Sequence, residues 1–339
     1  MRNFNRLLAF SLAVALTLTG STSVHAASDV SIDNLNYDKV GKAAFAEVNS
    51  YLQSRALITG KAEYIPSPNV MKREIEIETE LINKSVTVFS KWFLPAKFKV
   101  VMFTEKDGKW ADRALLKHGG QFPSKVSAEI KKQSKDGRLC NFAFATIANK
   151  DDKLSYECTD SKRVRDWTNF QNPPHEYFHL VQQQFGKLPL WLSEGSATFF
   201  GAAIGHYKIS PSGIRSKDFY MQTGASFDPE NKGFDHTRLG NHLRTLTSKQ
   251  SIKMFRALEG TDSWTQGEKL GHYGLGALAT EVLIAVWGLD KYIKMLENSG
   301  YDSVNWKSSF KSTYGLTPNE FYAKLTPYLK TVGYKHGLR

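Results

Sequence analysis

Cysteine is almost missing from this chain: among 339 residues there are only Cys140 and Cys158, eighteen positions apart. Thiolate zinc sites need closely spaced cysteines, and small disulfide scaffolds need many more of them, so both classes are excluded. In an oxidising compartment the two residues are expected to form a disulfide. A pair of buried free thiols is the alternative.

Long apolar runs are also missing, except at the beginning of the chain. A basic start, an apolar stretch from Leu7 to Gly20 and small residues before Ala27 predict a secretory signal at residues 1–26. The later apolar stretch from Leu275 to Gly288 is interrupted by Glu281, so no transmembrane anchor is expected. We therefore expect a protein that is secreted, or retained in a periplasm or cell envelope.

Acidic residues are too few to balance the basic ones, and the formal net charge is +12. The excess is largest in residues 91–165, where 17 Lys and Arg oppose 9 Asp and Glu, a difference of +8. Anionic polymers of the cell envelope are candidate partners for this region; a basic face that serves only solubility is the alternative. Zinc-finger spacing, a recognition-helix pattern and aromatic RNA-binding signatures are all missing, so no nucleic-acid partner is expected.

The most informative segment is His175-Glu176-Tyr177-Phe178-His179, an H-E-x-x-H pattern. On a helix, residues four positions apart share one face, so both imidazoles can reach one cation. With a carboxylate from Glu194 they form the three-ligand set of a catalytic zinc ion. Glu176 projects beside that face and can take a proton from water. The alternative is an amphipathic helix whose histidines coordinate nothing.

The residues around the motif predict two helices. Asn172 is an N-cap candidate followed by two prolines, the first helix continues to Phe185, and Gly186 stops it. A second helix is expected from about Pro189 to Phe200. Helices joined by a short turn pack as antiparallel neighbours, which can bring Glu194 back over the histidines.

These residues resemble the gluzincin zinc metallopeptidases, the clan of thermolysin and aminopeptidase N, and in particular its small secreted relatives. Trp191-Leu-Ser-Glu-Gly-Ser-Ala-Thr-Phe199 matches the pattern W-L-x-E-G-x-A-[ST]-[FY] that follows H-E-x-x-H in the aminopeptidases. The resemblance, over about thirty residues, implies a zincin-like fold, zinc bound by His175, His179 and Glu194, and Glu176 as general base. It also implies that Thr198 supports a ligand, with helix packing as the alternative.

The chain departs from the aminopeptidase pattern in two ways. The spacer between the second histidine and the carboxylate has fourteen residues, fewer than in those enzymes, so a tighter turn is expected. The G-x-M-E-N stretch that grips a free amino terminus is missing. Aminopeptidase activity is therefore not expected, and endo- and exopeptidase action stay open.

A second similarity lies at Tyr273-Gly274-Leu275-Gly276. In aminopeptidase-type enzymes a tyrosine in a Y-x-x-G setting donates a hydrogen bond to the tetrahedral intermediate. Such a donor is needed because attack on the carbonyl carbon builds negative charge on its oxygen. Tyr273 is the candidate and His272 its replacement; a packing role for the tyrosine is the alternative.

The rest of the chain predicts an α+β protein. Helices are expected at Tyr37–Leu57 and at Ile75–Phe93, where a strand is the alternative. A strand is expected at Phe98–Phe103, and a hairpin pairs Phe142–Ile147 with Leu154–Cys158. In gluzincins an edge strand pairs with the substrate backbone, and this hairpin is the candidate.

The expected order is a helical segment at 27–95, an α/β lobe at 96–187 that ends in the zinc-binding helix, and a mostly helical lobe at 188–339 that carries the third ligand. We thus predict an exported zinc-dependent peptidase that acts on peptides or proteins. A catalytically inactive binding protein on the same fold, and a zinc hydrolase of another amide or ester, are the alternatives.

Overall fold

The computed structural model describes residues 30–118, 125–135, 142–147, 153–165, 170–205, 238–260, 271–299 and 305–336. The secretory signal predicted at 1–26 lies outside these residues, and so does Cys140. Both the signal and the disulfide stay predictions.

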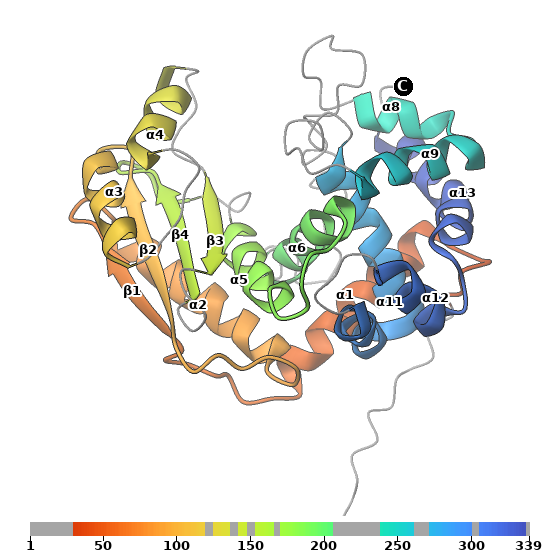
Figure 1. Cartoon of the computed structure of the whole chain (residues 1–339), viewed down its shortest axis with the longest axis horizontal. Helices are drawn as coiled ribbons and strands as arrows, with labels where there is room; N and C mark the ends of the chain where they lie inside the picture. Colours follow the sequence, from red (N-terminus) through yellow and green to blue (C-terminus); the bar gives the residue numbers. More distant parts are fainter. Residues whose placement is uncertain are drawn as a thin grey trace, which may run out of the picture.

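The described residues form a mixed α+β structure with many helices and one small sheet (Figure 1). The strands are β1 (Ala62–Pro66), β2 (Phe98–Thr104), β3 (Ala143–Ile147) and β4 (Lys153–Thr159). The described helices are α1 (Tyr37–Gln53), α2 (Lys72–Phe89), α3 (Gly108–Lys117), α4 (Val126–Lys135), α5 (Asn172–Gln182), α6 (Leu190–Gly205), α8 (Arg238–Arg244), α9 (Ser248–Glu259), α11 (His272–Ser299), α12 (Trp306–Tyr314) and α13 (Pro318–His336).

The sheet has the strand order β1-β2-β4-β3. The first three strands are parallel, while β3 lies at the edge and runs antiparallel to β4, with Phe144 opposite Tyr156. The predicted strand and hairpin are therefore confirmed. The segment 27–95, predicted as helical, contains α1 and α2 and also the strand β1. This strand is five residues long, ends in proline and lacks a regular alternation of buried and exposed residues, so periodicity does not reveal it.

The helices predicted in the first hundred residues are both present. Helix α1 covers most of Tyr37–Leu57, and α2 covers most of Ile75–Phe93, so the strand alternative there is wrong. Along α2 the buried apolar residues Ile77 and Leu81 are four positions apart, and so are Ile82 and Val86, the spacing that places two residues on the same side of a helix.

The two faces of the sheet pack into different clusters. On β2, Val101 and Phe103 face α3 and α4, while Val100 and Met102 join the main core. That main core is continuous with the helical part of the protein, because α1 packs on α11 and α2 packs on α5. Figure 1 shows α5 and α6 between the sheet and the group formed by α8, α9, α11, α12 and α13.

Helix α11 is the central helix of that group. It is broken at Gly288, where the apolar stretch from Leu275 ends: this glycine has φ 81° and ψ 164°, and a second helical part continues to Ser299. Within the described residues, α11 is the one helix long and apolar enough to cross a membrane, but 78% of its most apolar window is buried inside the protein. A helix buried in the core of a protein also meets these criteria of length and apolar composition.

Two glycines allow α6 and α11 to cross at close range. A methyl carbon built on Gly276 of α11 would lie 2.0 Å from the carbonyl oxygen of Trp191 and 2.7 Å from the Cα atom of Gly195, both on α6. A methyl carbon on Gly195 would lie 2.2 Å from the Cα atom of Gly276. The two backbones therefore touch, and only glycine fits at either position.

We predict that Gly276→Ala lowers the free energy of unfolding by about 1–3 kcal/mol or more, because the methyl group meets backbone atoms that no rotamer change can move. Urea denaturation measures the loss. The matched control is Gly260→Ala at the end of α9, where a methyl group meets no atom within 4 Å. A Gly276→Ala variant as stable as the control would contradict the close crossing.

Candidate metal centre

Helix α5 carries the H-E-x-x-H motif and has a sequence suited to begin and end where it does. Prolines occupy its first turn, and the amide of His175 donates to the carbonyl of Gln171 at 3.0 Å. The N-cap is thus Gln171, and the prediction of Asn172 is wrong by one residue because the hydrogen-bonded ladder already begins at the Gln171 carbonyl. The predicted end at Phe185 is wrong by three residues, because α5 ends at Gln182 with Gln183 as its C-cap. Gly186, with φ 89°, lies in the turn that follows.

Helix α6 lies against the first turn of α5, again because of glycines. A methyl carbon on Gly201 would lie 2.8 Å from the carbonyl oxygen of Gln171 and 3.2 Å from the Cβ atom of His175. At Gly205 it would lie 2.2 Å from the carbonyl oxygen of Phe170. This contact fixes the distance between the helix that carries both histidines and the helix that carries Glu194.

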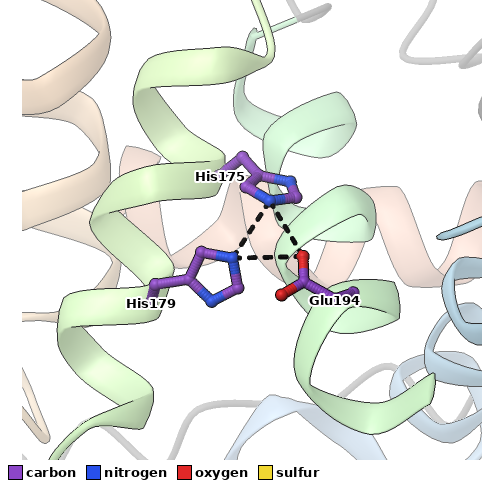
Figure 2. Close-up of side chains that lie close together, drawn as sticks. All are labelled: His175, His179 and Glu194. Carbon is purple, nitrogen blue, oxygen red and sulfur yellow. Dashed lines mark hydrogen bonds and ion pairs between the residues drawn. The ribbon is translucent and has the colours of Figure 1, made fainter. Parts of the chain in front are cut away.

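The two histidines and Glu194 point at one another (Figure 2). The Nε2 atoms of His175 and His179 are 3.1 Å apart, and the Glu194 Oε2 atom lies 3.5 Å and 3.3 Å from them. For tetrahedral zinc with ligand bonds of about 2.05 Å, two ligand atoms are about 3.3 Å apart. The three observed separations scatter around that value, so the donor set fits zinc in both chemistry and spacing.

Glu176 lies beside the three ligand atoms rather than among them. Its Oε1 atom is 4.0 Å from the Nε2 atom of His175, and its carboxylate accepts a hydrogen bond from the backbone amide of Ala145 on β3. Burial, helped by the nearby carboxylates of Glu194 and Glu157, raises the pKa of Glu176 to about 8 against the opposing effect of His179. Such a carboxyl group is tuned for proton transfer near neutral pH.

The ligand side chains perturb one another strongly. Burial lowers the pKa of His175, and the neighbouring His179 adds to this. Burial acts in the same direction on His179, but the carboxylates of Glu194 and Glu176 outweigh it and raise that pKa to about 9. Burial alone would raise the pKa of Glu194, yet the two histidines hold it well below its usual range. The site therefore favours an ionised carboxylate with positive charge beside it.

The structure also places the two candidates at the start of α11 close to this site. The ring of Tyr273 lies 6.1 Å from the ring of His175, centre to centre, and is partly exposed. The ring of His272 lies 4.1 Å from that of Tyr273 but is fully buried. Thr198 is buried too, and its hydroxyl has no hydrogen-bond partner among the described residues, which favours the packing interpretation for it.

Two features of the site were not singled out by the sequence. Gln182 accepts a hydrogen bond from His179 and donates to α6. Its position three residues after His179, on the same helix face, was an available signal. The contact of Glu176 with Ala145 depends on how the hairpin packs on α5, and nothing in the local sequence indicates it.

A buried ion-pair cluster holds the connection that leads into α5. Arg165, which is 4% exposed, contacts three carboxylates: Glu74 at 2.6 Å, Glu157 at 2.8 Å and Glu78 at 3.0 Å. Burial, together with the nearby Glu157, raises the pKa of Glu78 well above its usual value. Breaking such a cluster leaves buried charges unpaired and is strongly destabilising. The cluster thus ties α2 and β4 together just before helix α5.

We predict that the purified protein binds one zinc ion and that His179→Ala abolishes this binding, because two donors alone do not hold zinc tightly. A hundredfold excess of zinc over its dissociation constant should stabilise the wild type by about 2.7 kcal/mol, which thermal unfolding with and without chelator measures. The control is His242→Ala on α8, which should behave like the wild type. Equal zinc stabilisation of the His179→Ala variant would show that the ion binds elsewhere.

A scan against models of known protein families gave no match, and neither did searches of curated proteins and of solved structures. The resemblance to gluzincins therefore rests on the residues of α5, α6 and the start of α11, and the family stays a prediction.

Proposed function

We propose that this protein is an exported zinc-dependent peptidase of the gluzincin type. The observation that carries this proposal is the convergence of His175, His179 and Glu194 at tetrahedral ligand spacing, with the carboxylate of Glu176 4.0 Å to one side. A purely structural zinc site has four protein ligands, whereas three ligands and a free acid are the arrangement of a hydrolytic site. Zinc, when bound there, lowers the pKa of water and polarises the scissile carbonyl.

Glu176 is the general base in this proposal. Its carboxylate accepts a proton from the attacking water and then passes it to the nitrogen of the leaving amine. Because its pKa is raised above that of an ordinary carboxyl group, the ionised carboxylate is a stronger proton acceptor. The hydrogen bond from the Ala145 amide keeps the carboxylate beside the ligands without making it a ligand itself.

The edge strand β3 is the proposed docking surface for the substrate. Among the described strands β3 lies at the edge of the sheet and pairs with β4 alone, and an edge strand is where an extended peptide can add. The Ala145 amide, which contacts Glu176, lies on this strand, so a peptide added along β3 would pass the general base. A peptide or protein is therefore the proposed substrate class.

Tyr273 is the proposed donor to the developing oxyanion. It is partly exposed and lies next to a zinc ligand, whereas His272 has no accessible surface from which to reach a substrate. The tyrosine is preferred on that ground. The glycine crossing at Gly276, one turn further along α11, fixes the position of this helix start relative to α6.

We predict that Glu176→Gln lowers kcat for casein digestion by about 10²- to 10⁴-fold, the usual contribution of a general base. The amide is isosteric with the carboxylate but cannot accept the proton. Zinc content should stay at one ion per chain, since Glu176 is not a ligand. Equal digestion by wild type and variant would remove Glu176 from the mechanism.

The same assay distinguishes the other functions. Zinc binding without digestion of casein, but with hydrolysis of small amides or esters, would favour a different hydrolase. Failure of the wild type to bind zinc or to digest any substrate would favour the inactive binding protein. Tyr273→Phe serves as an internal comparison, because loss of the phenol should lower kcat with little change in KM.

A second proposal concerns the basic surface on α3 and α4. Lys106, Lys109 and Lys131 line a hollow of about 510 Å³ together with Trp110. The hollow also contains two carboxylates, which accept hydrogen bonds from the protein: Asp107 from Ser67, Asn69 and Thr104, and Glu105 from the amide of Ser161. None of the three lysines forms an ion pair with a described carboxylate. We propose that this surface binds an anionic polymer of the cell envelope and so retains the enzyme near it.

We predict that replacing Lys106, Lys109 and Lys131 with Gln makes the protein elute from a dextran sulfate column at clearly lower salt. The control replaces Lys249, Lys253 and Lys291, which are exposed on α9 and α11, and removes the same total charge. The control should elute close to the wild type. Identical elution of the two triple variants would mean that net charge alone governs binding.

A further inference from the structure

Gln182 is the last residue of α5 and is 4% exposed. Its Oε1 atom lies 2.7 Å from the Nδ1 atom of His179. Its Nε2 atom donates to the carbonyl oxygen of Ser193 at 2.8 Å and to the hydroxyl of Ser196 at 2.8 Å. The side-chain amide therefore uses its acceptor and both of its donors, in a place that water does not reach.

These partners permit only one orientation of the amide. The Ser193 carbonyl can accept a hydrogen bond but cannot donate one, so it must face the NH₂ group. The hydroxyl of Ser196 donates to the carbonyl of Leu192, and its oxygen is thus left to accept from Gln182. A flipped amide would place its oxygen against the Ser193 carbonyl oxygen and leave a buried N–H without an acceptor.

The orientation of the amide decides the tautomer of His179. Since an oxygen faces Nδ1, that nitrogen must carry the hydrogen and donate it. In the neutral ring the lone pair then lies on Nε2, the atom that points at Glu194 and His175. A metal ligand needs its lone pair on the atom that faces the ion.

The same side chain also ties the two ligand-bearing helices together. Its donors end on Ser193, the residue directly before Glu194, and on Ser196, half a turn after it. Gln182 thus contacts one zinc ligand directly and holds the backbone of another.

We infer that Gln182 is a positioning residue of the metal site: its oxygen fixes His179 in the tautomer that binds zinc, and its N–H groups hold α6, and with it Glu194, in register. This inference rests on the proposed zinc site. The role is separable into two parts, because the oxygen and the N–H groups contact different ligand-bearing elements.

The test compares three variants by zinc affinity, measured by competition with a chromophoric chelator, and by the melting temperature of the metal-free protein. Gln182→Met removes both functions at nearly the same volume. Gln182→Glu keeps an oxygen opposite Nδ1 but loses the N–H donors. Gln184→Met, two residues further on and exposed, is the matched control.

Gln182→Met is expected to bind zinc about 10- to 100-fold more weakly than the wild type. Gln182→Glu should bind clearly more tightly than Gln182→Met, while its metal-free form melts below that of the wild type. Gln184→Met should match the wild type in both measurements. This pattern distinguishes a positioning role from a packing role. If Gln182 only packed, its replacement would lower the melting temperature, and the glutamate variant would bind zinc no more tightly than the methionine variant.

Two results would overturn the inference: wild-type zinc affinity in folded Gln182→Met, or equal loss in the methionine and glutamate variants. If Gln182→Met does not fold, the test depends on Gln182→Glu alone. A zinc affinity of Gln182→Glu as low as that of His179→Ala, which lacks a ligand, would refute the role of the oxygen. A wild type that binds no zinc refutes the metal site itself. A wild type that binds zinc but cleaves no peptide refutes only the peptidase.

Discussion

Helix α6 is confined between two other helices at distances that only glycine permits, and this constraint decides where Glu194 lies. Gly201 and Gly205 let α6 touch the first turn of α5, and Gly195 lets it touch α11 at Gly276. Close-packed interiors transmit small displacements, so a shift of α6 at either contact would move the carboxylate relative to the histidines. The site is thus held from two sides by backbone contacts rather than by long, flexible side chains.

The sequence was sufficient for the part of the fold that obeys local rules. The i, i+4 histidines and the two prolines indicate α5, and the alternating apolar residues around Phe144 and Tyr156 indicate the hairpin. The sequence was insufficient where the cause is tertiary. Strand β1 exists because β2 pairs with it, and its own five residues show no clear pattern.

The residues of the candidate site also fall into a group that the sequence indicates and a group that it does not. Its ligands and its base could be proposed from spacing alone, because a helix turns those residues to one side. The glycines of α6 gave no such indication, since a glycine in a helix has no local signature for close approach. The positions of Arg165 and Ala145 depend on which elements pack together, and Gln182 is recognisable only once the Ser193 carbonyl is seen opposite its amide.

The electrostatics of the site explain why so many buried groups around it are polar. Two imidazole nitrogens 3.1 Å apart, with a carboxylate oxygen 3.3 Å from one of them, favour positive charge among them in a largely buried place. The two histidines accordingly hold the pKa of Glu194 well below its usual range. Glu176 meets the opposite condition, because burial beside Glu194 and Glu157 favours its neutral form. Helices α5 and α6 together present a set of groups that favours positive charge, and α5 adds beside it a carboxyl group with a raised affinity for a proton. That difference comes from the environment rather than from residue type, and it is what allows two glutamates a few ångströms apart to be assigned different roles.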